Sequence, residues 1–337
     1  MKITINDIAK MANVSKGTVS RVINNKPEGV SEETRRRILK IIDEVGYVPN
    51  SNARSITVSE TKTIGLIIPD VSNPFFAELA RGVEDCSSKY GYTVFLCNSD
   101  MSLEKQKDYL NALLEKRVDG IILNTSGDFN DPKFRDKFYK INIPVVLIDR
   151  KTEDLERYKG VFIDNVEAGY MATKYLISGG NENIAYLGGT CGIDTSMKRL
   201  RGYDKAINEA GIRLNPDYII FGDYTIKSGY ERTLSLMKKH GEIQAIFAGS
   251  DIIAIGAIKA LKDMNLSVPD EVEVVGIDNI SISNLVSPSL TTVAQPIYEI
   301  GYKASEKLIN FINNKSDYED EFLPTKLVVR NSTRKRT

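Results

Sequence analysis

Residues 4–25 read TINDIAKMANVSKGTVSRVINN, and this stretch decides the fold of the N-terminal segment. The spacing of Thr4 and Asp7 is that of a capping box, so we expect a helix to begin near Ile5. Apolar residues at i, i+3 and i+4 spacing follow. Asn13 then interrupts this pattern, and asparagine tolerates the left-handed conformation of a tight turn. The first helix is therefore expected to be short and to end in a sharp turn.

A second short helix is expected directly after the turn, with Ser15 as its cap. Two helices joined so closely predict a helix-turn-helix, whose second helix enters the major groove of DNA. On that helix Lys16, Gly17 and Arg21 face away from the apolar residues. Residues 1–27 hold five Lys and Arg residues against one Asp, 5 − 1 = +4, a local charge that suits DNA phosphates.

Residues 30–50, VSEETRRRILKIIDEVGYVPN, predict a third helix that begins after Ser31 and stops at Gly46. The geometry alone leaves two interpretations open, a DNA-binding module and a three-helix bundle that binds another protein. The sequence of residues 4–25 and 30–50 resembles that of the headpiece of the LacI/GalR family of bacterial regulators. That resemblance implies base reading by Lys16, Gly17 and Arg21 and phosphate contacts by a further set, Thr4, Ser15, Thr18, Ser20 and Asn24.

Residues 49–60 resemble the hinge helix of the same family, which inserts an apolar side chain into the minor groove and bends the operator. The implied contacts are Asn50, Ala53, Arg54 and Ile56. Ile56 stands where family members commonly carry leucine. A plain linker is the alternative interpretation of this segment.

From residue 63 onward, short apolar runs alternate with helix-length amphipathic segments, which favours parallel sheets covered by helices. The runs are TIGLIIP, YTVFLC, DGIILN, PVVLID, NIAYLG, QAIFAG and VEVVGID. Seven such units exceed one sheet, so we expect an all-α headpiece and an α/β core of two doubly wound lobes around a cleft. The core resembles periplasmic sugar-binding proteins.

The expected organisation is a headpiece over 1–48, a hinge over 49–60, an effector-binding core over 61–330 and a basic tail over 331–337. By the resemblance, each lobe of the core is discontinuous. The chain would cross between lobes near 161, 290 and 321, giving an N-lobe of 61–160 and 291–320 and a C-lobe of 161–289 and 321–330.

Several side chains with the chemistry that sugar hydroxyls need stand where strands are expected to end. Carboxylates, amides and guanidinium groups bind hydroxyls, and aromatic rings pack on sugar faces. The candidates match ribose-type pockets in order: Asn73, Phe75, Phe76, Asp149, Arg150, Arg199, Tyr224, Ser250, Asp278 and Gln295. Ser250 departs from the asparagine of such pockets. In the alternative interpretation, Phe75 or Phe76 belongs to the core and Asp149-Arg150 is a solvated pair.

Enzymatic activity is not expected. His240 is the single histidine, which disfavours catalytic triads and metal sites, and we expect no cofactor and no metal. The GGTCG run at 188–192 lacks the spacing of a phosphate loop. Cys86, Cys97 and Cys191 form no CxxC pair and are expected to be small core residues in a reducing compartment. No segment suits a membrane or a signal peptide, so the expected location is the cytoplasm, with the nucleoid as the site of operator binding.

The resemblance predicts a transcriptional regulator, by family habit a repressor of sugar-utilisation genes, that binds a pseudo-palindromic operator in double-stranded DNA. A small sugar, with a ribose-like pentose as first choice, would bind between the lobes and control it allosterically. The alternative is a catabolite control protein that responds to the serine-phosphorylated phosphocarrier protein HPr. Purine-like effectors are a third option.

A homodimer is the expected working unit, because a two-fold operator needs two recognition helices. No leucine-rich heptads follow the last expected strand, so a tetramer is not expected. The subunit interface is expected along exposed helices of both lobes, including those near Phe75 and over 255–261.

Overall fold

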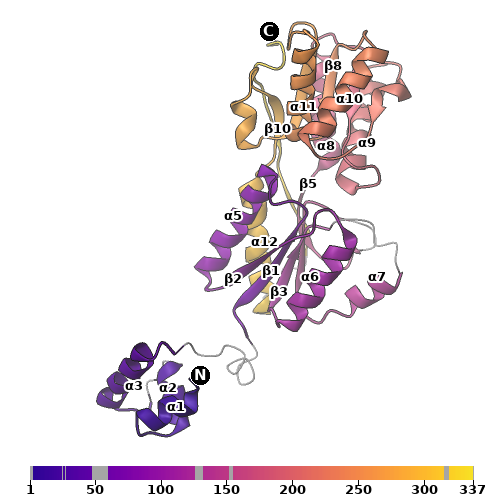
Figure 1. Ribbon diagram of the computed structural model, residues 1–337. Coiled ribbons are helices and arrows are strands. Elements are labelled where there is room, and N and C mark those ends of the chain that lie inside the picture. The colour runs from indigo at the N-terminus through magenta and orange to yellow at the C-terminus, as the bar shows by residue number, and fades with distance from the viewer. Residues whose placement is uncertain are drawn as a thin grey trace. The chain divides into compact units, whose positions relative to one another are not determined.

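The computed structural model describes residues 3–24, 26, 28–47, 60–125, 132–151, 155–314 and 319–336. The chain divides into two compact units, Met1–Thr61 and Lys62–Thr337 (Figure 1). The candidate hinge contacts Asn50, Ala53, Arg54 and Ile56 lie outside the described residues.

The first unit contains the expected three helices, α1 (Ile5–Met11), α2 (Lys16–Ile23) and α3 (Glu32–Glu44). Thr4 and Asp7 form the predicted capping box, and Ser15 caps α2 by accepting from the Thr18 backbone N–H. The turn between them has Asn13 in the left-handed conformation at φ 47°. The buried core of this unit consists of Ile8, Ala9, Ala12, Val19, Val22 and Ile38.

The second unit has two lobes, each built on a six-stranded sheet (Figure 1). The strands of the first lobe are β1 (Thr63–Ile68), β2 (Thr93–Asn98), β3 (Gly120–Leu123), β4 (Val145–Ile148), β5 (Gly160–Ile163) and β11 (Glu321–Leu323). Its helices are α5 (Pro74–Lys89), α6 (Leu103–Glu115), α7 (Pro132–Tyr139) and α12 (Ile297–Ile312).

The second lobe has the strands β6 (Ile184–Leu187), β7 (Ile219–Ile220), β8 (Ala245–Ala248), β9 (Glu273–Asp278), β10 (Thr291–Ala294) and β12 (Lys326–Val328). Its helices are α8 (Asn165–Ile177), α9 (Asp194–Glu209), α10 (Ile226–Lys239) and α11 (Asp251–Asp263), with the short 3-10 helices η2 (Pro216–Tyr218) and η3 (Ser281–Asn284).

The strand orders are β11-β5-β4-β3-β1-β2 and β12-β10-β9-β8-β6-β7, and the recorded pairings are parallel except β10 with β12. These orders confirm the predicted two-lobed α/β core, in which the chain crosses between the lobes three times. The chain enters the second lobe after 163, returns after 294 and leaves again after 323. The crossings were expected near 161, 290 and 321, which lie within β5, just before β10 and at the first residue of β11.

Three helix pairs, α5–α12, α8–α9 and α10–α11, pack with their backbones in contact. In the first pair, a Cβ on Gly82 would collide with the carbonyl oxygen of Tyr298, and a Cβ on Gly301 would collide with that of Leu79. The other two pairs repeat the arrangement through Gly169 with Gly202 and Gly229 with Gly256. Each lobe therefore relies on glycine to bring paired helices close.

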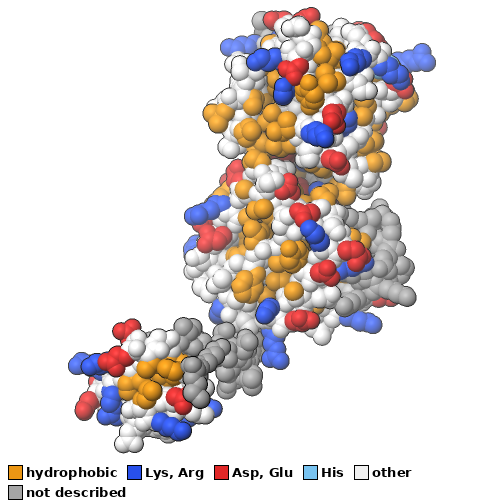
Figure 2. All heavy atoms as spheres, in the orientation of Figure 1, with side chains coloured by type: hydrophobic (Ala, Val, Ile, Leu, Met, Phe, Trp, Pro, Cys, Tyr) orange, Lys and Arg blue, Asp and Glu red, His pale blue; other side chains and the backbone are white. Residues whose placement is uncertain are grey.

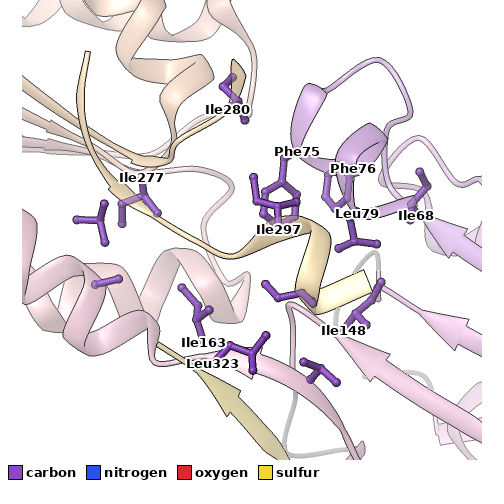
Figure 3. Packing of buried hydrophobic residues seen from close by; sticks show 14 of the residues in the cluster. Ile68, Phe75, Phe76, Leu79, Ile148, Ile163, Ile277, Ile280, Ile297 and Leu323 are labelled. Atoms are coloured by element: carbon purple, nitrogen blue, oxygen red, sulfur yellow. The ribbon is translucent and has the colours of Figure 1, made fainter. Parts of the chain in front are cut away.

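A hydrophobic cluster extends across both lobes where the connecting segments pass (Figure 3). Phe75 and Phe76 from α5 lie beside Ile297 at the start of α12. Ile277 and Ile280 belong to the second-lobe part of the cluster. Of the three cysteines, Cys86 and Cys97 are buried as expected, but Cys191 is exposed, since it stands in the loop after β6.

Residues 331–336, which belong to the expected basic tail, are packed against the second lobe. Arg334 and Arg336 form ion pairs with the fully buried Glu273 at 2.9 and 2.8 Å. Ser332 is also buried and donates to the Val274 carbonyl. Among the helices that the structure describes, none is long and apolar enough to cross a membrane.

Candidate functional site

The exposed surface of α2 carries the three candidate base-reading positions. Lys16 and Gly17 lie in its first turn and Arg21 in its last, and all three are exposed. The guanidinium of Arg21 lies against the following turn, where a Cβ on Gly29 would lie 3.2 Å from Nη1 of Arg21. The N-terminus of a helix attracts anions through its free N–H groups, so this end of α2 suits a phosphate backbone.

The candidate phosphate contacts sit at helix ends. Thr4 and Ser15 are the N-caps of α1 and α2, and the hydroxyls of Ser15 and Thr18 are 2.9 Å apart. Asn24 ends α2, where its amide donates to the carbonyl of Ser20 at 2.8 Å. These groups are therefore held in place by the headpiece before any ligand binds.

A cavity of about 410 Å³ lies between the two lobes of the core, a size that is typical of small-molecule sites. Eight of the ten candidate effector residues line it: Asn73, Phe75, Phe76, Asp149, Arg150, Arg199, Tyr224 and Asp278. They come from both lobes and stand at or just beyond the carboxyl ends of strands, as expected for open parallel sheets.

An aromatic corner closes the first-lobe side of the cavity. The rings of Phe75 and Phe76 meet edge to face with centroids 5.0 Å apart, and both side chains are almost fully buried. Asn73 caps α5 by accepting from the Phe75 N–H at 3.0 Å, so its side-chain NH₂ remains as a donor. Both phenylalanines therefore belong to the core and to the cavity wall.

Asp149 and Arg150 are buried and do not form a solvated pair. Asp149 has a left-handed backbone at φ 61°, and its carboxylate accepts from the Asn124 amide at 3.0 Å. Arg150 donates through Nη1 to the Thr125 carbonyl at 3.0 Å and lies with Nε 3.6 Å from Asp149. Nε is buried without a hydrogen-bond partner in the described part of the chain.

Arg199 and Asp278 face each other from the second lobe at 3.9 Å. The guanidinium also donates to Asn165 at 2.8 Å and to the Gly249 carbonyl at 2.5 Å. Burial raises the pKa of Asp278 well above its usual range, and the Arg199 charge opposes this rise. The neighbouring carboxylates of Asp251 and Asp149 raise the Asp278 pKa further.

Ser250 and Gln295 are the two candidates that do not line the cavity. Ser250 is buried as the N-cap of α11. Gln295 lies behind the wall, where its amide donates to Asp278 at 2.7 Å. It therefore contacts a lining residue rather than the cavity.

The cavity wall contains further residues that the sequence reading did not select. They follow β1, β2, β6 and β7 in the chain: Pro69, Asp70, Asp100, Met101, Thr190, Ile193, Thr195, Asp223 and Thr225. Their position just after strand ends was the available signal. The wall thus combines buried carboxylates, two guanidinium groups, hydroxyls and aromatic rings. Within the described residues, no group of His, Cys, Asp and Glu is arranged to hold a metal ion.

Comparison with known proteins gives two family matches, "Bacterial regulatory proteins, lacI family" over residues 4–50 and "Periplasmic binding proteins and sugar binding domain of LacI family" over residues 61–332. The catabolite control protein A of Priestia megaterium is 40% identical over 336 residues, covering 99% of this chain and 100% of that protein. The ribose operon repressor of Halalkalibacterium halodurans is 42% identical over 333 residues, covering 98% and 97%.

Two solved structures of such regulators are also similar to this chain. The lac repressor dimer bound to operator is 25% identical with a TM-score of 0.87, covering 99% of both chains. A LacI family regulator from Enterococcus faecium with bound ribose is 30% identical with a TM-score of 0.72, covering 80% of this chain and 98% of that one.

Proposed function

Because the chain belongs to the lacI family of bacterial regulatory proteins, whose members are DNA-binding transcriptional repressors and not enzymes, we propose that a ribose-like sugar controls it. The sugar would bind in the cavity between the lobes and regulate genes of sugar utilisation. The proposed location is the cytoplasm.

One observation supports a sugar most directly: eight side chains of sugar-binding chemistry, selected from the sequence, line one cavity. The buried Nε of Arg150 lacks a hydrogen-bond partner in the described part of the chain. A ligand hydroxyl would supply the missing acceptor and so remove the cost of a buried unsatisfied donor. The likeness to a ribose operon repressor and to a regulator with bound ribose favours a pentose.

For the headpiece, we propose that Lys16 and Arg21 read bases in the major groove and that the capping hydroxyls contact phosphates. Phosphate contacts position a protein on DNA, and contacts to base edges specify the sequence. Gly17 offers no side chain to a base, so its proposed role is close approach of the backbone. The proposed minor-groove contact of Ile56 rests on the sequence alone.

The second candidate effector is serine-phosphorylated HPr, favoured by the 40% identity to a catabolite control protein over the whole chain. A cavity between the lobes that is lined by charged and aromatic side chains supports a small ligand instead, since a protein partner would bind an exposed surface.

Calorimetry of the full chain with a panel of pentoses and hexoses, and separately with phosphorylated and unphosphorylated HPr, tests both candidates. Saturable binding of a pentose supports the sugar proposal. Binding of phosphorylated HPr alone, with no heat from any sugar at millimolar concentration, rejects it.

We also propose a homodimer. The subunit interface was expected to include the helix over 255–261, but the apolar residues there are mostly buried within the lobe. The exposed apolar surface of the core lies elsewhere. It includes Phe95 and Leu96 on the edge strand β2, both more than 40% exposed, and Leu285 at 80%. Figure 2 shows hydrophobic side chains gathered on both lobes of the core. An exposed apolar edge strand is a liability unless a partner covers it.

A further inference from the structure

A buried carboxylate, that of Asp251, lies in the second lobe behind the cavity wall. Its Oδ2 accepts from the Ser283 hydroxyl at 2.6 Å and from the Ile280 N–H at 3.0 Å. Its Oδ1 accepts from the Thr292 hydroxyl at 2.5 Å. One side chain thus joins α11 to the turn after β9, to η3 and to β10. Gly276 leaves room for this arrangement, because a Cβ there would collide with Oδ1.

The turn that Asp251 holds has a strained backbone. Asp278 and Asn279 have φ of 126° and 62°, in a region that non-glycine residues rarely adopt. Such residues persist only where their surroundings fix them. Here Gln295 donates to the Asp278 carboxylate, Arg330 donates to the Asn279 side chain at 2.6 Å, and Asp251 accepts from the next N–H, that of Ile280.

The carboxylate of Asp251 is not needed to cap its own helix. Ser250 already caps α11 by accepting from the Ile253 N–H. Burying a carboxylate costs free energy, and the recorded hydrogen-bond partners of Asp251 are neutral donors. The nearby carboxylate of Asp278 adds repulsion. Stabilisation of the fold therefore does not by itself explain why this position holds an aspartate.

We propose that Asp251 is a positioning residue for effector recognition, which fixes the turn over 278–280 so that the Asp278 carboxyl faces the cavity. This inference rests on the proposed sugar effector. Asp251 itself does not line the cavity, so it acts through Asp278.

The charge state of Asp251 provides a readout that distinguishes positioning from packing. Burial raises the pKa of Asp251 to about 6, although hydrogen bonds from Ser283, Thr292 and the backbone of residues 279 and 280 favour the ionised form. The charged group that faces Asp251 is Asp278 from β9, and Asp278 in turn faces Arg199 from α9 and Asp149 from the end of β4. Protonation of Asp251 replaces an acceptor with a donor, so the hold on the turn weakens as pH falls through about 6.

The test measures ribose affinity of the full chain by calorimetry between pH 5.5 and 8, with thermal unfolding as a check of folding. Ser283→Ala and Asp251→Ala should weaken ribose binding roughly tenfold or more, since each removes hydrogen bonds to a buried charge. Asp251→Asn mimics the protonated carboxyl, because it also puts a donor where an oxygen accepted, so at neutral pH it should bind ribose as weakly as the wild type does below pH 6. The wild-type affinity should fall below pH 6, and Asp251→Asn should abolish this fall.

Asp263→Asn is the matched control, because Asp263 ends the same helix in an exposed ion pair with Lys259. If Asp251→Ala does not fold, Ser283→Ala decides. Wild-type affinity and wild-type pH dependence in the Asp251 and Ser283 variants would overturn the inference alone. Absence of sugar binding by the wild type would overturn the proposed function and this inference with it.

Discussion

The hydrogen bonds that the structure records for the Arg199 side chain all go to residues of the second lobe. Nε and Nη1 donate to Asn165 and to the Gly249 carbonyl, and Nη2 lies near Asp278. A guanidinium fixed in this way loses little entropy when a ligand binds. The residue is therefore set in position for a hydroxyl before the ligand arrives.

Arg199→Ala should weaken sugar binding by about 1.5–3 kcal/mol, the cost of a charge-assisted hydrogen bond. Calorimetry with the sugar that binds the wild type measures the loss. Arg201→Ala is the control, because Arg201 lies two residues along α9 and is exposed. Equal losses in the two variants would contradict the assigned role of Arg199.

Arg21→Ala should weaken binding to a selected operator by about 1–3 kcal/mol and binding to random DNA far less, as a base-reading residue requires. Gel-shift titration at one salt concentration measures both affinities, on a site selected from a random pool. Arg36→Ala, an exposed change on α3, serves as control. A loss of the same size on both DNAs would make Arg21 a phosphate contact.

At the residue scale, the sequence predicted the types of side chain at the site better than it predicted which of them line the cavity. The eight candidates on the cavity wall were found because some, such as Asp149, stand at the end of an apolar run, and because the whole set resembles ribose-type pockets in its order. Gln295 and Ser250 lie behind the wall because the side-chain direction at a strand end depends on backbone angles that no spacing rule gives. The strained φ of Asp278 is an example.

Among the elements, the paired helices depend on glycines that periodicity analysis ignores. Apolar patterning shows which face of a helix is buried but not how closely two helices approach. Gly82 and Gly301 let α5 and α12 touch backbone to backbone. The seven apolar runs all became strands, and a last strand was expected where β12 lies, whereas β5, β7, β10 and β11 were not identified as strands from the sequence.

Gly82→Ala should lower the free energy of unfolding of the core by about 1–3 kcal/mol, because the added methyl meets backbone that cannot turn aside. Thermal unfolding of the full chain shows this as a lower Tm. Gly241→Ala should have little effect, since its nearest neighbour would lie 3.9 Å from the added Cβ. An unchanged Tm for Gly82→Ala would show that the helices can separate without cost.

At the scale of the whole molecule, Leu285 tests the proposed dimer. Leu285→Asp would place a charge in an apolar interface and should raise the free energy of dimer formation by about 2 kcal/mol or more. Sedimentation equilibrium at micromolar concentration should then show monomer. Phe322→Asp is the control, because Phe322 is 60% exposed on β11, at the opposite edge of the first sheet from β2. A wild-type monomer, or a stable mass of four chains, would contradict the dimer.

The late position of β11 and β12 in the chain has a consequence for the order in which the protein is made. Both sheets receive their last strand from residues 321–328, and Glu273 receives its arginines from 334 and 336. During synthesis, neither lobe can complete its sheet until this segment has left the ribosome. The headpiece is a separate compact unit that precedes both lobes in the chain. Each newly made molecule can therefore fold its DNA-binding unit before either lobe of the core has its last strand.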